Sequence, residues 1–184
     1  GWDRALNRLR EMGNGLDRMR ELVVKLRTFS RLDEGERKTV SLRASVESLL
    51  TILGHRLKDR IQVETYFGEP DAIDCYPGLL NQALMNLVAN AIDAIPAQGV
   101  IVISTSSDSE WLTISVTDNG HGIPEELRHR VVDPFFTTKP VGQGTGLGLS
   151  ITDSIVRRHA GRLELLPNAG GGTEARIRIP RRMA

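Results

Sequence analysis

The spacing of apolar residues divides the chain into a helical N-terminal segment and a mixed domain. Between residues 2 and 32, apolar side chains recur every seven residues in two series, the a/d pattern of helices that pack in bundles. Arg and Glu fill many of the other positions, so the apolar stripe is narrow. This pattern predicts one long helix that dimerises in a bundle, and the alternative is an amphipathic helix lying on its own domain. The two series are Trp2, Leu9, Leu16 and Val23, and Ala5, Met12, Met19 and Leu26.

A polar stretch at residues 33–38 follows this helix and marks a domain boundary. We therefore expect a helical domain at 1–35 and a second domain at 36–184. Within the second domain, mixed helices and mostly antiparallel strands predict an α+β fold, a two-layer α/β sandwich. The predicted strands are 39–42, 61–67, 72–75, 100–106, 111–117, 162–166 and 173–179. The predicted helices are 44–58, 77–95, 125–131 and 147–160.

Composition narrows the class of protein. The chain has 184 residues and a net charge of +1, so nothing points to a nucleic-acid surface. Cys75 is the only cysteine, which excludes a disulfide within the chain and a cysteine zinc cluster. No apolar run approaches the ~20 residues needed to span a bilayer, and no signal peptide opens the chain. We expect a cytoplasmic protein, or the cytoplasmic piece of a longer one.

A glycine-rich stretch at residues 142–148 is the strongest local signal. Gly142, Gly144, Gly146 and Gly148 alternate with other residues immediately before an apolar, helix-like run. Glycine lets backbone amides approach a ligand, and the start of a helix adds free N–H groups and partial positive charge. These features predict an anion site with phosphate as the expected ligand, and a flexible surface loop is the alternative. The spacing matches neither a P-loop nor the G-x-G-x-x-G of dinucleotide-binding folds.

Two asparagines share one face of the predicted helix at 77–95. Asn86 and Asn90 are i, i+4 neighbours, and Asp93 follows one turn beyond Asn90. Asparagine is a mediocre helix former, so two on one face of an apolar helix need a reason. Either they satisfy buried backbone groups, or they ligate a hard cation such as Mg²⁺, which binds through oxygen together with substrate phosphates.

Asp118 ends an apolar strand and enters a glycine turn. A carboxylate there can accept a hydrogen bond from the exocyclic amine of adenine, and Gly120 and Gly122 would let a flat base lie against the backbone. The alternative is a simple Asx turn, which Asp-Asn-Gly forms often.

The order of these motifs resembles the ATP-binding domain of sensor histidine kinases, which belong to the GHKL superfamily. Four segments are similar to that family's N, G1, F and G2 boxes, and Gly171-Gly-Thr173 fits its terminal G3 element. The resemblance spans residues 40–180, and residues 16–34 are similar to the second helix of the family's dimerisation domain. The four segments are 86–93, 118–123, 133–139 and 144–149.

This resemblance implies the Bergerat ATP-binding fold, a layer of helices over a mixed sheet, preceded by a long dimerisation helix. It implies ATP and Mg²⁺ as cofactors, with Asn90 as the main metal ligand and Asn86 contributing nearby. Asp118 would read the adenine amine, with Thr173 beside it through water, and Gly120 and Gly122 would admit the base.

The F and G2 boxes imply the phosphate end of the site. Residues 131–146 would form a mobile lid in which Lys139 offers positive charge to the phosphates. The resemblance thus assigns catalysis to Asn86, Thr138 and Lys139. The other implied nucleotide-binding residues are Asp93, Ile123, Phe135, Phe136, Gly144, Thr145, Gly146, Leu147, Gly148 and Leu149.

The implied activity is transfer of the γ-phosphoryl group of Mg·ATP to a histidine, for relay to the receiver domain of a response regulator. The implied full-length protein is a homodimer, for example a membrane-bound sensor with this part in the cytoplasm.

Two related classes of protein are disfavoured. ATP hydrolases of the superfamily carry a Glu base in the region of Asn86, and because an amide cannot take a proton from water, Asn86 argues against hydrolysis. The heptad helix argues against a serine kinase of the anti-sigma-factor type. A kinase-like nucleotide sensor without phosphotransfer is the alternative.

The chain holds four histidines, and none lies in the family's acceptor context on a preceding heptad helix. We expect His55, His121, His129 and His159 each to be solvent-facing or structural. The acceptor would therefore lie on a helix upstream of Gly1 or on another protein, and we expect the isolated chain not to phosphorylate itself.

Overall fold

The computed structural model describes residues 2, 4–9, 11–13, 15–16, 19, 35–139 and 144–181. In the N-terminal segment, every described residue up to Met19 is helical, and its apolar residues Trp2, Leu9, Met12 and Leu16 are exposed. The remainder of the predicted helix, with Val23 and Leu26, lies outside the described residues. The dimerisation interface and the boundary at residues 35 and 36 therefore stay predictions.

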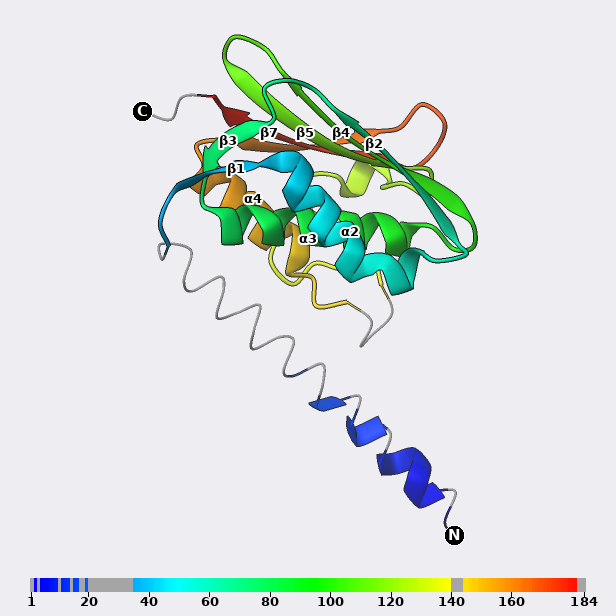
Figure 1. Ribbon diagram of the computed structural model, residues 1–184. Coiled ribbons are helices and arrows are strands. Elements are labelled where there is room, and N and C mark those ends of the chain that lie inside the picture. The colour runs from blue at the N-terminus through cyan, green and yellow to red at the C-terminus, as the bar shows by residue number, and fades with distance from the viewer. Residues whose placement is uncertain are drawn as a thin grey trace.

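The second domain is a sheet with helices on one side (Figure 1). The main sheet has five strands in the order β2-β4-β5-β7-β6, and all neighbours are antiparallel except β2 and β4, which are parallel. The other two strands, β1 and β3, pair antiparallel in a separate sheet. This arrangement confirms the predicted α+β two-layer sandwich and the mixed sheet. The elements are β1 (Lys38–Ser41), α2 (Leu42–Leu57), β2 (Ile61–Phe67), β3 (Ala72–Cys75), α3 (Pro77–Ala94), β4 (Gly99–Ser107), β5 (Trp111–Asp118), η1 (Glu125–Leu127), α4 (Gly148–Arg158), β6 (Arg162–Pro167) and β7 (Thr173–Pro180).

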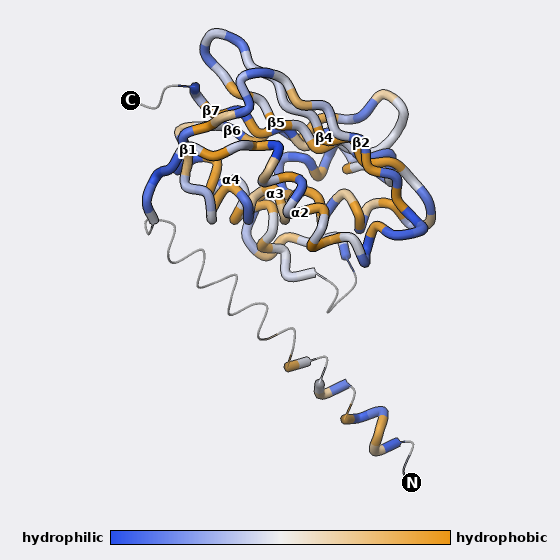
Figure 2. Tube along the Cα trace, in the orientation of Figure 1, coloured by the Kyte–Doolittle hydropathy of each residue, from blue (hydrophilic) through white to orange (hydrophobic). Residues whose placement is uncertain are grey.

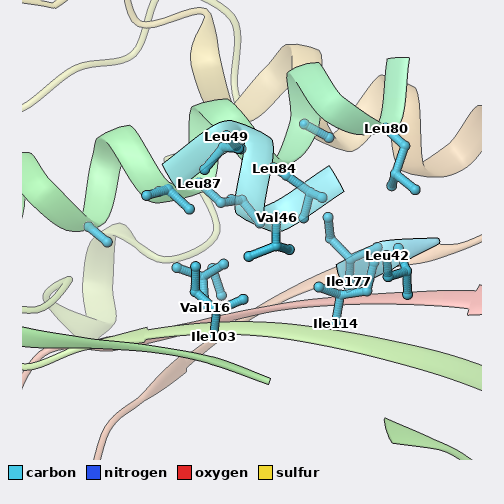
Figure 3. Close-up of a cluster of buried hydrophobic side chains, with 14 of the residues drawn as sticks. Leu42, Val46, Leu49, Leu80, Leu84, Leu87, Ile103, Ile114, Val116 and Ile177 are labelled. Atoms are coloured by element: carbon cyan, nitrogen blue, oxygen red, sulfur yellow. The ribbon is translucent and has the colours of Figure 1, made fainter. Parts of the chain in front are cut away.

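The core lies between the sheet and the helices, where hydrophobic residues of both layers meet (Figure 2). Leucines and valines from α2 and α3 pack onto isoleucines and valines of the inner sheet face, shown in Figure 3. Each such side chain, fully buried, contributes about 1.5–3 kcal/mol to folding. The core therefore fixes α3, the helix that carries both asparagines, against the strands. The labelled members are Leu42, Val46, Leu49, Leu80, Leu84, Leu87, Ile103, Ile114, Val116 and Ile177.

All four helices predicted in this domain differ in length from the observed elements, and two of them, α3 and α4, are only slightly shorter than predicted. The helix predicted at 44–58 begins earlier, at Leu42, because the Ser41 hydroxyl accepts a hydrogen bond from Ala44 N (3.0 Å) as an N-cap. The helix predicted at 125–131 is wrong in extent, because only Glu125–Leu127 form a 3-10 turn. None of the residues of that turn is buried, so packing does not extend it.

Within the described ranges, none of the helices combines the length and apolar character that crossing a membrane requires.

Candidate functional site

Helix α3 presents Asn86 and Asn90 to the first turn of α4. The Asn86 amide nitrogen donates to Gly148 O (3.1 Å) and Thr152 Oγ1 (3.4 Å). A Cβ built at Gly148 would lie 4.0 Å from both Asn86 Cγ and Asn90 Nδ2. The structure thus brings together the two predicted metal ligands and one of the predicted phosphate-site glycines. The side-chain nitrogen of Asn86 thus satisfies a backbone carbonyl, which is one of the two roles that the sequence left open. The side-chain oxygen is the atom that can bind a cation.

The start of α4 has the properties of an anion site. Leu147 occupies the N-cap position, and its apolar side chain cannot accept a hydrogen bond from the N–H groups of the first turn. These N–H groups, with the partial positive charge of the helix end, favour a phosphate oxygen. Thr145 and Leu149 were also assigned to nucleotide binding from the sequence; Thr145 precedes this turn and Leu149 lies within it.

Gly146 holds the F-box segment against the glycine segment. Its carbonyl accepts a hydrogen bond from Phe135 N (2.9 Å), and a Cβ on Gly146 would lie only 2.4 Å from the Phe135 carbonyl carbon. Both residues have left-handed backbones, with φ +65° at Gly146 and +67° at Phe135. Phe135 remains 66% exposed, whereas the Phe136 ring lies 4.7 Å from the Arg130 guanidinium carbon. Residues 140–143 lie outside the described residues, so the mobility of the predicted lid stays a prediction.

Lys139 points to α3. Its ammonium group forms an ion pair with Asp93 Oδ2, while Asp93 Oδ1 lies 2.5 Å from Arg56 Nη2 of α2. The predicted nucleotide-binding residue Asp93 is thus paired with two cations. Thr138, the residue before Lys139, is exposed.

Asp118 lies buried at the end of β5, where its carboxylate is held by backbone groups. Its Oδ1 accepts hydrogen bonds from Gly120 N (2.8 Å) and Thr173 N (3.4 Å), so Asp118 and Thr173 come together as the resemblance implied. Burial raises the pKa of Asp118, and the two backbone hydrogen bonds oppose that shift. With Oδ1 held in this way, Oδ2 is the oxygen that can accept from an amine. Ile123 and Thr173 also line a single narrow hollow next to β6.

The glycines around Asp118 are required by the protein's own packing. A Cβ on Gly120 would lie 2.3 Å from Ala94 O, and a Cβ on Gly172 would lie 2.1 Å from Asp118 O. His121 N donates to the same Ala94 carbonyl (3.0 Å), so the turn after β5 is fastened to the C-terminus of α3. The turn after β5 therefore lies close to the C-terminus of α3 because of the protein's own packing, independently of a bound adenine base.

Two residues that the sequence did not identify support this end of the site. The Asn168 side chain donates to Asp118 O (3.0 Å), which ties the turn between β6 and β7 to the end of β5. Arg60 donates to the carbonyls of Ile92, Ile95 and Ala97 and so caps the C-terminus of α3. Asn168 lies in a glycine-rich turn whose sequence indicates only the turn, and both contacts join residues distant in sequence.

The histidines lie as expected for residues without an acceptor role. His55, His121 and His129 are exposed, and His159 is fully buried with hydrogen bonds to backbone groups.

Comparison with known proteins gives the same assignment as this geometry. Residues 76–183 match the family described as histidine kinase-, DNA gyrase B- and HSP90-like ATPase. The C4-dicarboxylate transport sensor protein DctB of Pseudomonas aeruginosa is 31% identical over 182 residues, covering 95% of this chain and 29% of that protein. The signal transduction histidine-protein kinase AtoS of Escherichia coli is 35% identical over 169 residues, covering 90% of this chain and 27% of the relative. The chain thus spans less than a third of these two relatives.

Solved structures agree with the relatives. The catalytic domain of histidine kinase ThkA has a TM-score of 0.73 at 30% identity, covering 79% of this chain and 96% of that one. Histidine kinase ThkA in complex with the response regulator TrrA has a TM-score of 0.76 at 26% identity, covering 92% and 49%. Because the family match covers more than half of the sequence, and the relatives are sensor kinases, this chain belongs to the histidine kinase-, DNA gyrase B- and HSP90-like ATPases and is a histidine-kinase ATP-binding domain of that family.

Proposed function

We propose that this chain is the catalytic core of a sensor histidine kinase, which transfers the γ-phosphoryl group of Mg·ATP to a histidine outside residues 1–184. The observation that supports this proposal most is the meeting of Asn86 and Asn90 with Gly148 at the first turn of α4. Amide oxygens suit Mg²⁺, which keeps several waters and binds substrate phosphates, and the helix N-terminus suits the phosphates themselves. Bound Mg²⁺ would neutralise charge on the β- and γ-phosphate oxygens.

Different residues bind the base and the phosphates of the nucleotide. Asp118, held by Gly120 N and Thr173 N, accepts from the adenine amine and fixes the base. The first turn of α4 binds the phosphates, and Lys139 adds charge at the γ-phosphate. Positioning and charge neutralisation then supply most of the rate enhancement, as is general for phosphoryl transfer.

In the transfer step, one bond to the γ-phosphorus forms and one breaks. The acceptor imidazole is neutral and attacks the γ-phosphorus through the nitrogen that carries no proton. The bond from that phosphorus to the bridging oxygen breaks, and ADP leaves with the electron pair. The proton on the other imidazole nitrogen is released to solvent. Water is a poor competitor because Asn86 offers no base to deprotonate it.

We further propose that the acceptor helix lies upstream or on a second chain, that the full-length protein is a homodimer, and that a response regulator receives the phosphoryl group. The relative ThkA, solved with a response regulator, supports the last point. A nucleotide sensor without phosphotransfer remains the alternative, and the two differ in whether phosphate moves.

The binding half of the proposal is tested by calorimetry with Asp118→Asn, which keeps the size of the side chain but adds a donor. ATP affinity should fall at least tenfold, since a buried acceptor is then mismatched. Asp74→Asn is the matched control, because Asp74 is a solvent-exposed carboxylate on β3. Equal ATP affinity in wild type and Asp118→Asn would contradict the assignment of Asp118.

The transfer half is tested with ATP labelled at the γ-phosphate. The chain alone should stay unlabelled, and the same chain joined to its upstream acceptor helix should gain label that is lost in acid and survives base. Acid-labile label on the isolated chain, abolished by replacing one of its four histidines, would show that the acceptor lies within residues 1–184.

A further inference from the structure

The carboxylate of Asp93 is shared between two cations from different parts of the fold. Oδ1 faces Arg56 of α2 at 2.5 Å, and Oδ2 faces the ammonium group of Lys139. All three side chains are about one third exposed, at 34–35%. Ion pairs this accessible to water are weak and exchangeable, so they do not lock the fold.

The position of Asp93 relates this pair to the phosphate end of the site. Asp93 follows Asn90 by one turn of α3, and Asn90 faces Gly148 at the start of α4. The side chain of Lys139 runs close to Gly144, since a Cβ on Gly144 would lie 3.1 Å from Lys139 Cδ, and Lys139 N donates to Thr137 Oγ1 (3.1 Å). Lys139 is thus held near the phosphate end by its backbone and by Asp93.

We propose that Asp93 is a positioning residue that holds Lys139 when the nucleotide has no third phosphate, and so limits how strongly the chain prefers ATP to ADP. This inference rests on the proposed function. The γ-phosphate of ATP competes with Asp93 for the ammonium group, whereas ADP lacks that group and leaves Lys139 on Asp93. Arg56 makes the exchange favourable, because it continues to neutralise Asp93 after Lys139 has moved.

The first test compares ATP and ADP affinities, both with Mg²⁺, in wild type and Asp93→Asn. Removing the competing carboxylate should raise ATP affinity about two- to fivefold, the range expected for one accessible ion pair, and change ADP affinity less. Asp74→Asn is the matched control, since Asp74 on β3 forms a pair with Arg37 that has the same length as the pair between Asp93 and Arg56, 2.5 Å. The control should leave the ratio of the two affinities unchanged.

A double mutant separates action through Lys139 from direct repulsion between Asp93 and the nucleotide. In the Lys139→Gln background, Asp93→Asn should no longer change the ratio of ATP affinity to ADP affinity. Persistence of the full gain without Lys139 would overturn the proposal, because Asp93 would then act on the nucleotide directly. The gain in the single mutant should also shrink at high salt, as expected for partly exposed charges.

Arg56→Gln should change the ratio of ATP affinity to ADP affinity in the direction opposite to Asp93→Asn. Without Arg56, release of Lys139 would leave Asp93 unpaired, so the ATP to ADP ratio should fall below that of wild type. A ratio that does not change in Asp93→Asn would overturn the inference and leave the kinase assignment intact. Wild-type chain that binds neither nucleotide would instead contradict the proposed function.

Discussion

His159 and Tyr76 are joined by a hydrogen bond across 83 positions of the chain. The backbone N–H of Tyr76 donates to Nε2 of His159 (3.0 Å), and the opposite ring nitrogen, Nδ1, lies 2.8 Å from Ile155 O and donates to it. An imidazole that accepts at one nitrogen and donates at the other is neutral. The fully buried ring thereby ties the end of α4 to the start of α3, the two helices that meet at the candidate phosphate site.

This arrangement predicts a loss of stability in acid. Burial lowers the pKa of His159 below its ordinary 6.5, and the nearby cations Arg37 and Arg158 lower it further. The unfolded chain therefore binds the proton more readily than the folded one. The stabilisation is fully present above pH 6.5 and is lost as the pH falls below it.

The measurement is urea unfolding between pH 5 and 7.5. His159→Gln removes the titrating group and should flatten the pH dependence, although it lowers stability at neutral pH. His55→Gln replaces an exposed histidine and should leave the slope as in wild type. A wild-type slope in His159→Gln would assign the acid sensitivity to other groups.

The turn between β6 and β7 contains three neighbouring glycines that differ in backbone conformation and in the space available to a Cβ. Gly172→Ala should cost about 2–4 kcal/mol and abolish ATP binding, because its φ is +90° and the new Cβ would meet Asp118 O. Gly171→Ala meets nothing within 4 Å but has φ +93°, so strain alone should cost about 1–2 kcal/mol. Gly170→Ala meets nothing and should change stability by less than about 0.5 kcal/mol.

Thermal unfolding and calorimetry with ATP measure this series together. Graded destabilisation with loss of binding only in Gly172→Ala supports the role of that glycine in holding Asp118. Equal effects at Gly171 and Gly172 would show that backbone strain, and not the contact with Asp118, is the cause.

Gly148 should separate stability from nucleotide binding. A Cβ there fits without a clash, 4.0 Å from the two asparagines, and alanine is the better helix former. Gly148→Ala should therefore keep or raise stability, by up to about 1 kcal/mol, while the added methyl group lowers affinity for Mg·ATP. Gly54→Ala in α2, whose new Cβ meets nothing within 4 Å, is the control and should raise stability without changing binding. Unchanged affinity in Gly148→Ala would place the phosphates elsewhere.

The sequence could predict what depends on local pattern. Seven strands and three of the long helices follow from periodicity and turn residues, and the shared face of Asn86 and Asn90 follows from helical spacing. The partners of Lys139 and Asn168 could not be predicted in this way, because side-chain contacts between distant segments depend on how the layers pack. The short turn at Glu125–Leu127 failed as a helix because helical periodicity without a buried face does not stabilise one.

Asn168 is expected to position Asp118 from the opposite side of the turn. Its side chain donates to Asp118 O (3.0 Å), while its own backbone N–H donates to Gly172 O (3.2 Å) and its carbonyl accepts from Gly171 N (2.9 Å). Asn168→Asp replaces the donor with an acceptor that faces the Asp118 carbonyl and places a second carboxylate near that of Asp118. ATP affinity should fall about tenfold, the effect of losing a partly buried hydrogen bond and leaving a polar group unsatisfied.

Asn168→Ala is the comparison that removes the donor without adding charge, and it should fall between wild type and Asn168→Asp. In the Asp118→Asn background, both substitutions should lose most of their effect on ATP affinity, because the residue they position no longer reads the base. Nucleotide affinities measured by calorimetry for these variants give the coupling directly. Full additivity between the substitutions at positions 118 and 168 would mean that Asn168 stabilises the turn without positioning Asp118.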